Sequence, residues 1–189
     1  LLKNYGHSIN EIKKTGFKIT KKFKMYSNVS IKNDDGASMV SAFGIAVTKL
    51  SKILKKNKPD IVLSGFDIAA NFAVTIAAAH MNIPVAHIQG GEVSGTIDES
   101  IRHAMSKFSH YHFVSNTDAF KRLIKMGEEK SKVFIVGCPS IEALFSEESI
   151  STRLLSKKFG INFKKKFYLV IQHSVTSEVN EAKKQIKNT

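Results

Sequence analysis

Residues 58–91, KPDIVLSGFDIAANFAVTIAAAHMNIPVAHIQGG, decide the fold class. The segment holds two short apolar runs, DIVLSG at 60–65 and IPVAHIQ at 83–89, and an apolar stretch of helical length over 68–80 lies between them. A strand-length run, a helix and a second strand-length run are typical of a β-α-β unit, and such units build parallel sheets. We therefore predict an α/β domain.

The same alternation extends outward from this unit in both directions. FKITKKFKM at 17–25 is strand-like, and SMVSAFGIAVTKLSKILKKN at 38–57 repeats apolar residues at three- and four-residue spacing, as amphipathic helices do. Right-handed crossovers would assemble these segments into a doubly wound parallel sheet of the Rossmann-like type. The remaining predicted elements are a helix over roughly 97–109, the strand YHFVS, a helix over 118–126, the strand KVFIVG, helical segments up to residue 159 and the strand FYLVIQH.

Composition indicates a globular protein, with 42% hydrophobic and 24% charged residues in a chain of 189. The longest apolar stretches, such as FAVTIAAA at 72–79, are shorter than the roughly 18 residues that a membrane-spanning helix needs. Cys138 is the single cysteine, so neither an internal disulfide nor a thiolate metal cluster is expected. We expect a cytoplasmic protein with no membrane partner, no cofactor and no metal.

The net charge of +13 results from 29 basic and 16 acidic residues. Such an excess can indicate a nucleic-acid partner. The lysines, however, are scattered over helix ends and connecting segments, and they do not alternate with aromatic residues as in common RNA-binding modules. We therefore predict a solvated basic surface and no nucleic-acid partner.

Polar residues follow the predicted strands directly. Asp67 comes shortly after DIVLSG, Gln89 to Glu92 follow IPVAHI, and Gln172 and His173 follow FYLVI. In open parallel sheets, ligands bind beyond the carboxyl ends of the strands. The sequence therefore predicts a site at this rim.

Several of these residues also have an ordinary structural explanation. Asp67 can cap the helix that follows it. Gly90 and Gly91 can mark a tight turn that needs positive φ. His173 can be a hydrogen-bonded residue at the end of a strand. These alternatives stay open at this point.

The predicted helix after this rim begins with the pattern T-x-x-E, formed by Thr96 and Glu99. This pattern is typical of a capping box, which would account for Glu99. Asp98 and Arg102 are four residues apart, as are Glu99 and His103, so both pairs can be ordinary pairs on a helix surface. Taken separately, none of these residues identifies a chemistry.

Taken together, the segments resemble the UDP-N-acetylglucosamine 2-epimerase family, and within it the hydrolysing branch. HIQGGEVSGTIDESIRHAMSKFSHYHFV at 87–114 is similar to the signature segment of the family. Four more blocks occur in the same order as in the family, and they extend the resemblance over almost the whole chain. These blocks are KPDIVLSGFD, MNIPVAHI, VFIVGCPSIEAL and VIQHSVTSE.

The resemblance implies a fold of two Rossmann-like domains, similar to the GT-B-like fold of nucleotide-sugar enzymes, with the active site in the cleft between them. Residues 1–163 would form the N-terminal domain without its first strand, and 164–189 would start the C-terminal nucleotide-binding domain. The sequence has no initiator methionine and stops shortly after a predicted strand. We therefore expect a fragment of a longer protein, inactive by itself.

Members of the hydrolysing branch abstract the proton at carbon 2 of the sugar, expel UDP from carbon 1 and add water to the resulting glycal. The resemblance implies that Asp98 opens the catalytic helix, while Arg102 orients it or contacts the diphosphate. The residues matching catalytic positions are Asp67, Asp98, Arg102 and His173, and those matching substrate-binding positions are His87, Gln89, Gly91, Glu92, Glu99 and His103.

The sequence departs from the family pattern at three places. Gln89 replaces a glutamate proposed as acid or base in the animal enzymes, and an amide cannot transfer a proton. Ile68 and Ala70 replace an arginine and an acid after Asp67, and Ser174 replaces a proline. These departures indicate an altered substrate, for instance a 2,4-diacetamido sugar nucleotide, or weak activity.

Our leading hypothesis from the sequence is a hydrolysing UDP-N-acetylglucosamine 2-epimerase that supplies N-acetylmannosamine for sialic-acid-type sugars. The alternatives are a hydrolysing epimerase of a 2,4-diacetamido UDP-sugar, a non-hydrolysing epimerase, and a nucleotide-sugar-binding protein with impaired catalysis. The expected partners are a UDP-sugar and further copies of the chain in a homodimer or homotetramer.

Overall fold

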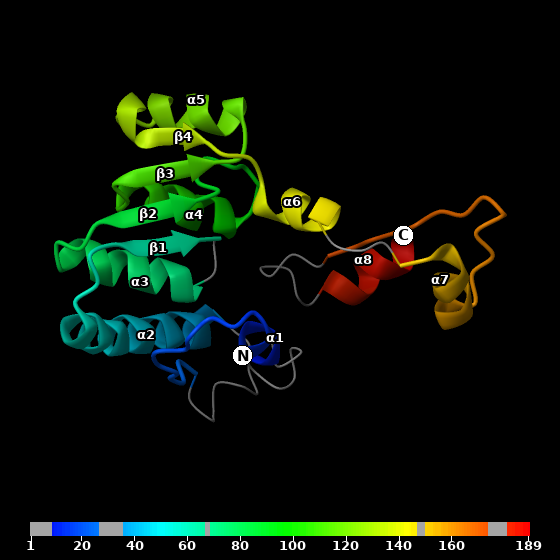
Figure 1. Cartoon of the computed structure of the whole chain (residues 1–189), viewed down its shortest axis with the longest axis horizontal. Helices are drawn as coiled ribbons and strands as arrows, with labels where there is room; N and C mark the ends of the chain where they lie inside the picture. The colour runs from blue at the N-terminus through cyan, green and yellow to red at the C-terminus, as the bar shows by residue number, and fades with distance from the viewer. Residues whose placement is uncertain (1–8, 27–35, 67–68, 147–149, 174–180) are drawn as a thin grey trace. The chain divides into compact units, whose positions relative to one another are not determined.

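The computed structural model describes residues 9–26, 36–66, 69–146, 150–173 and 181–189 (Figure 1). The chain divides into two compact units, Leu1–Val136 and Gly137–Thr189, which are described separately below. The catalytic candidate Asp67 lies outside the described residues, as do Ile68 and Ser174. The domain boundary at 163/164 stays a prediction.

The first unit contains a four-stranded, fully parallel sheet in the order β1-β2-β3-β4. The prediction of a Rossmann-like α/β fold is therefore confirmed. The predicted strand–helix–strand connections from β1 to β4 are present, and the helix ends lie within two residues of the predicted ones. The elements are β1 Val62–Gly65, α3 Ala69–His80, β2 Val85–Ile88, α4 Ile97–Lys107, β3 Tyr111–Val114, α5 Thr117–Lys125, the 3-10 helix η2 Lys130–Lys132 and β4 Val133–Ile135.

The three crossover helices pack against the same face of the sheet. Parallel register pairs Ser64 with His87, and His87 with His112, so these residues share one face. Thr75 of α3 bonds Ser64 at 2.9 Å, and Ser106 of α4 lies 3.1 Å from His87. The α5 residues Ala119 and Leu123 pack in an apolar cluster with Val114 and Val133, the latter also on this face. Sequential strand order with right-handed crossovers produces this one-sided arrangement.

The opposite face of the sheet is partly open among the described residues. Leu63, Tyr111 and Phe134 are exposed large side chains of this face. The Phe113 and Phe134 rings stack there at 5.7 Å between centroids. The buried residues that position the loops therefore lie on the helix-covered side.

Helix α2, Gly36–Asn57, precedes the sheet and matches the predicted amphipathic helix. By length and composition alone it could cross a membrane, which corrects the expectation that no segment is long and apolar enough. Its Ala42, Ala46 and Leu54 are buried, and Leu54 packs in a core cluster with Val62 and Val85. These contacts pack one face of α2 against the core of the first unit.

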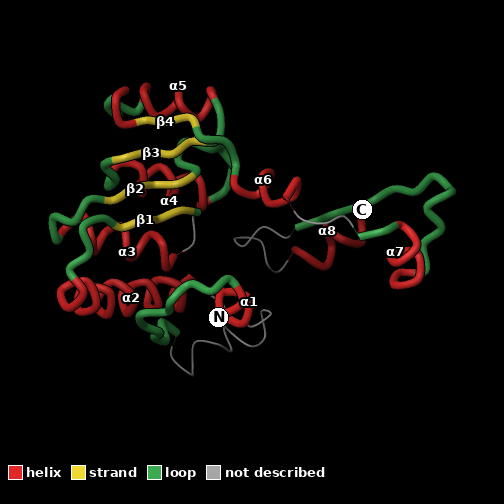
Figure 2. The backbone as a smooth tube through the Cα atoms, in the orientation of Figure 1, coloured by secondary structure: helices red, strands yellow, loops and turns green. Residues whose placement is uncertain are grey.

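Two predicted strands are absent from the described structure. FKITKKFKM follows α1, Ile9–Lys14, and is irregular, and FYLVIQH is a loop in which Tyr168 is 98% exposed (Figure 2). A strand requires a partner for its N–H and C=O groups, and neither segment pairs with a described strand. The described part of the second unit contains three helices, α6 Pro139–Ser146, α7 Thr152–Phe159 and α8 Ala182–Asn188.

Candidate active site

The loop from β2 to α4 begins with a left-handed residue at the rim of the sheet. Gln89 has φ +59°, and its N–H donates to the Phe113 carbonyl at 2.8 Å, which extends the β2–β3 pairing by one residue. Phe66, at the end of β1, has φ +62°. Phe66 and Gln89 directly follow the register partners Gly65 and Ile88. A non-glycine residue with a left-handed backbone carries a strain of about 1–3 kcal/mol, and such residues concentrate at functional sites.

The two glycines after Gln89 are required by packing. At Gly91, with φ +80°, an added Cβ would lie 2.6 Å from the Ala119 carbonyl oxygen and 3.1 Å from Leu123 Cγ. At Gly90 it would lie 2.8 Å from His87 Nδ1. The loop is thus pressed against α5 on one side and the buried His87 on the other. This contact explains the glycines without a ligand, so the substrate-binding role of Gly91 stays a prediction.

Glu92 holds the loop to the end of β3. Its Oε1 accepts hydrogen bonds from the Ser115 hydroxyl and, at 3.1 Å, from the Asn116 amide. Arg102 of α4 donates from Nη1 to the Glu92 carbonyl oxygen at 2.9 Å and is 9% exposed. Arg122 of α5 donates to the neighbouring Gly91 carbonyl. Two guanidinium groups on two helices therefore fix this backbone.

The first turn of α4 commits Glu99 to a structural task. Thr96 is the N-cap, and its hydroxyl accepts from the Asp98 N–H at 3.3 Å. Glu99 Oε2 accepts from the Ser94 and Gly95 N–H groups, both at 2.8 Å. These backbone hydrogen bonds, first that from Gly95, hold the pKa of Glu99 below its ordinary value. Glu99 therefore accepts backbone hydrogen bonds at the helix start, as a capping box predicts. Its donors are the N–H groups of Ser94 and Gly95, and not that of the N-cap residue Thr96.

Asp98 remains the carboxylate of α4 available for chemistry. It is partly buried, and its Oδ2 accepts a hydrogen bond from the Thr96 hydroxyl at 3.1 Å. A carboxylate with a lowered pKa, such as Glu99, is a weak general base. His103 Nε2 lies 3.8 Å from Glu99 Oε1, one turn further along the helix. The catalytic role of Asp98 stays a prediction. The partial exposure of its carboxylate is compatible with that role.

His87 lies beneath the loop and does not reach its surface, being 0% exposed. Its Nδ1 lies 3.1 Å from the Ser106 hydroxyl oxygen, and that hydroxyl donates to the Arg102 carbonyl at 3.2 Å. With the hydroxyl hydrogen on the Arg102 carbonyl, the tautomer that carries its proton on Nδ1 fits this contact. Burial, then the charges of His112, Arg102 and His103, lower the pKa of His87 to about 3. His87 thus makes a supporting contact with α4, and its predicted contact with substrate stays a prediction.

Eight of the ten predicted site residues lie in this loop, in α4 or directly beneath them: His87, Gln89, Gly91, Glu92, Asp98, Glu99, Arg102 and His103. His173 belongs to the second unit, where it is exposed, and its role stays a prediction. Prediction missed the residues that hold the loop: Ser115, Asn116, Arg122 and Ser106. Ser115 and Asn116 directly follow β3 and could have been found by the same strand-end rule, whereas nothing in the sequence marks Ser106 or Arg122. The described residues contain no group of three or more His, Cys, Asp or Glu side chains placed to bind a metal.

Comparisons with known proteins identify relatives of the chain. The family model for UDP-N-acetylglucosamine 2-epimerase matches residues 2–189. The chain is 38% identical, over 97% of its length and 48% of the relative, to a UDP-N,N'-diacetylbacillosamine 2-epimerase (hydrolyzing) of Legionella pneumophila. It is 35% identical, over 97% of its length and 47% of the relative, to a GDP/UDP-N,N'-diacetylbacillosamine 2-epimerase (hydrolyzing) of Campylobacter jejuni.

Solved structures show the same relationship. A crystal structure of UDP-GlcNAc 2-epimerase from Neisseria meningitidis bound to UDP-GlcNAc superimposes with a TM-score of 0.58 at 26% identity. The match covers 68% of this chain and 38% of that one. The chain thus spans about half the length of the curated relatives it matches.

The packing of the loop predicts a difference between two glycines that share a left-handed backbone. Gly91→Ala should lower the free energy of unfolding by at least about 2 kcal/mol, because overpacking adds to the backbone cost. Gly95→Ala is the matched control: Gly95 has φ +70° with nothing within 4 Å of an added Cβ, and about 1 kcal/mol is expected. Urea unfolding of both variants measures the difference, and equal losses would contradict the proposed contact with α5.

The buried His87 predicts a dependence of stability on pH. Below its ordinary pKa the unfolded chain binds a proton at His87, whereas the folded protein does not until about pH 3. The neutral ring therefore stabilises the folded protein at pH 7.5. As the pH falls to 5.5, protonation of His87 in the unfolded chain lowers the free energy of unfolding by about 1 kcal/mol. Urea unfolding at both pH values should show this extra loss in the wild type relative to His87→Gln.

An NMR titration of the His87 ring in the folded protein gives an independent answer. A ring that stays neutral at pH 5 supports the burial described here. A ring that titrates near pH 6.5 contradicts it, whether or not the His87→Gln variant folds.

Proposed function

Because the chain belongs to the UDP-N-acetylglucosamine 2-epimerase family, we propose that the protein is a hydrolysing 2-epimerase of a UDP-linked 2,4-diacetamido sugar, of the N,N'-diacetylbacillosamine type. The observation that carries this proposal is that both relatives described above act, by name, on such a sugar. Each of them aligns with nearly the whole chain. The sequence hypothesis of UDP-N-acetylglucosamine as substrate is supported at the level of the family, and the diacetamido alternative has the better support.

The rim of the first unit suits a sugar nucleotide. Gln89 stands at the end of β2 on a backbone that is fixed by its bond to Phe113 and by the packed glycines after it. An amide side chain both donates and accepts hydrogen bonds, as an acetamido group does. The amide of Gln89 thus matches the hydrogen-bonding groups of an acetamido substituent. This match supports a substrate with more than one acetamido group.

The proposed reaction breaks the C2–H bond, passes the proton to a base and expels UDP as the C1–O bond breaks, leaving a C1=C2 double bond. Water then adds its oxygen to C1, and a proton returns to C2 from the opposite face. Because Gln89 cannot transfer a proton, we assign proton removal at C2 and proton return to C2 to two carboxylates. These are Asp98 and the predicted catalytic residue Asp67. Arg102, already bonded to the Glu92 carbonyl, holds the loop in place beside Asp98.

A second candidate is a nucleotide-sugar-binding protein without turnover. The observation that favours it is Gln89, which removes one expected acid or base. It predicts binding of a UDP-sugar with no release of UDP. Creation of activity by Gln89→Glu would support this candidate.

The assay incubates the whole protein with UDP-N,N'-diacetylbacillosamine and, separately, with UDP-N-acetylglucosamine. We expect UDP and the free 2-epimerised diacetamido sugar from the first, at a kcat/KM at least tenfold above that for the second. A pocket that hydrogen-bonds a polar group discriminates strongly against substrates that lack it. A UDP-linked product would assign the non-hydrolysing reaction, and no release from either substrate would reject the proposal.

Asp98→Asn should lower kcat by roughly 10² to 10⁴, the usual contribution of a general acid or base. Asp118→Asn is the control, because Asp118 is an exposed residue in the first turn of α5 and takes no part in the proposed chemistry. Full activity in Asp98→Asn would remove Asp98 from the mechanism.

A further inference from the structure

Helix α4 lies between two apolar clusters and contributes to neither. One cluster joins α2, α3, β1 and β2, and the other joins β3, α5 and β4. The buried residues of α4 are Arg102, Met105 and Ser106, so a single buried apolar side chain anchors the helix. Burial of one such side chain contributes about 1.5–3 kcal/mol. With Ile101 and Ala104 only half-buried, the position of α4 depends on its polar contacts as well as on Met105.

Three of its residues make these polar contacts. In the middle of the helix, Arg102 donates to the Glu92 carbonyl. In the last turn, Ser106 contacts His87 of β2. At the last residue, Lys107 Nζ lies 2.7 Å from Glu128 Oε1 and 3.2 Å from the Met126 carbonyl oxygen. Of these three contacts, the one made by Lys107 lies outside the candidate site described above.

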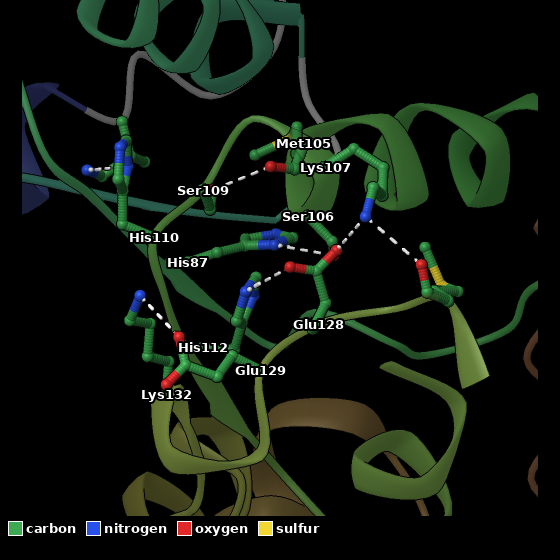
Figure 3. A network of polar contacts seen from close by, with 12 residues as sticks. His87, Met105, Ser106, Lys107, Ser109, His110, His112, Glu128, Glu129 and Lys132 are labelled. Carbon is green, nitrogen blue, oxygen red and sulfur yellow. Dashed lines mark hydrogen bonds and ion pairs between the residues drawn. The ribbon is translucent and has the colours of Figure 1, made fainter. Parts of the chain in front are cut away.

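Glu128 joins three elements through one carboxylate (Figure 3). It lies in the turn between α5 and β4, and its side chain is 11% exposed. While Oε1 holds Lys107 of α4, Oε2 lies 3.2 Å from Nε2 of His112 at the start of β3. Burial lowers the pKa of His112, so the neutral ring donates its Nε2–H to the carboxylate.

The lysine–carboxylate pairs elsewhere in the described residues are different in kind. Lys14–Glu11, Lys132–Glu129 and Lys184–Glu181 are exposed and join residues three apart on one stretch of chain. Exposed pairs of this kind contribute about 0–1 kcal/mol. Lys107 and Glu128, in contrast, are 21 residues apart and tie one helix to the turn after another. Lys107 is itself 52% exposed, whereas Glu128 is 11% exposed, so removal of Lys107 leaves a largely buried carboxylate with His112 as its remaining partner.

We propose that Glu128 is a positioning residue, which fixes the C-terminal end of α4 through Lys107 and so sets the placement of Arg102 in the middle of the helix and of Asp98 in its first turn. No substrate group needs to touch Glu128 for this. The kinetic consequence rests on the proposed function, whereas the effect on α4 itself does not. A displacement of about 1 Å in a reacting group can cost 10²-fold in rate.

The test measures hydrogen exchange of peptides from α3, α4 and α5 in the whole protein, together with steady-state kinetics. Glu128→Ala should speed exchange in 97–107 at least tenfold more than in α3 or α5. It should also lower kcat at least tenfold with KM within about twofold, the pattern of an interaction made in the transition state. Glu129→Ala is the matched control, since the adjacent Glu129 pairs with Lys132 at the surface, and it should change neither.

A second pair of variants acts from the other partner. Lys107→Met should reproduce the effect of Glu128→Ala, and Lys107→Arg, which keeps the charge, should restore most of the wild-type kcat. If Glu128→Ala fails to fold, the comparison of Lys107→Met with Lys107→Arg tests the proposal in its place. Uniform acceleration of exchange across α3, α4 and α5, or a Glu128→Ala variant that behaves as Glu129→Ala, overturns the proposal. A wild type that turns over no nucleotide sugar rejects the proposed function, and the exchange data still decide the role of Glu128.

Discussion

The hydrogen bond from Arg102 to the Glu92 carbonyl is the contact on which the candidate site depends. It ties α4 to the loop that leaves β2, and that loop must also fit between α5 and His87. Because Arg102 is 9% exposed, its guanidinium is partly removed from water and gains from each hydrogen bond it keeps. Asp98 and Glu99 begin the same helix, so their placement follows from this bond and from the polar contacts further along α4.

The parallel sheet and its helices could be predicted because their signals are local. β1 to β4 are short apolar runs bounded by polar or glycine residues, and α2 repeats its apolar residues with helical spacing. FYLVIQH carries the same signal as β2, yet it is a loop, because a strand also needs a partner that the described residues do not provide. The pattern of a segment thus shows its capacity to pair, and the partner determines whether it does.

The sequence identified most residues of the candidate site. It was less informative about the role that each residue has. Glu99 is committed to backbone N–H groups, and His87 is buried beneath the loop, although both lie in the signature segment. Burial of His87 results from the register of three adjacent strands, which a single strand does not reveal. Glu128 was missed for a similar reason: it is 21 residues from Lys107 and 16 from His112.

The proposed chemistry is tested most directly by running the reaction on UDP-N,N'-diacetylbacillosamine in D₂O and analysing the product by mass spectrometry and NMR. The account predicts free UDP and a free 2-epimerised sugar that carries one deuterium at C2, since the proton removed there is replaced from solvent. Release of UDP with the original hydrogen retained at C2 and unchanged configuration would show simple hydrolysis and contradict the account.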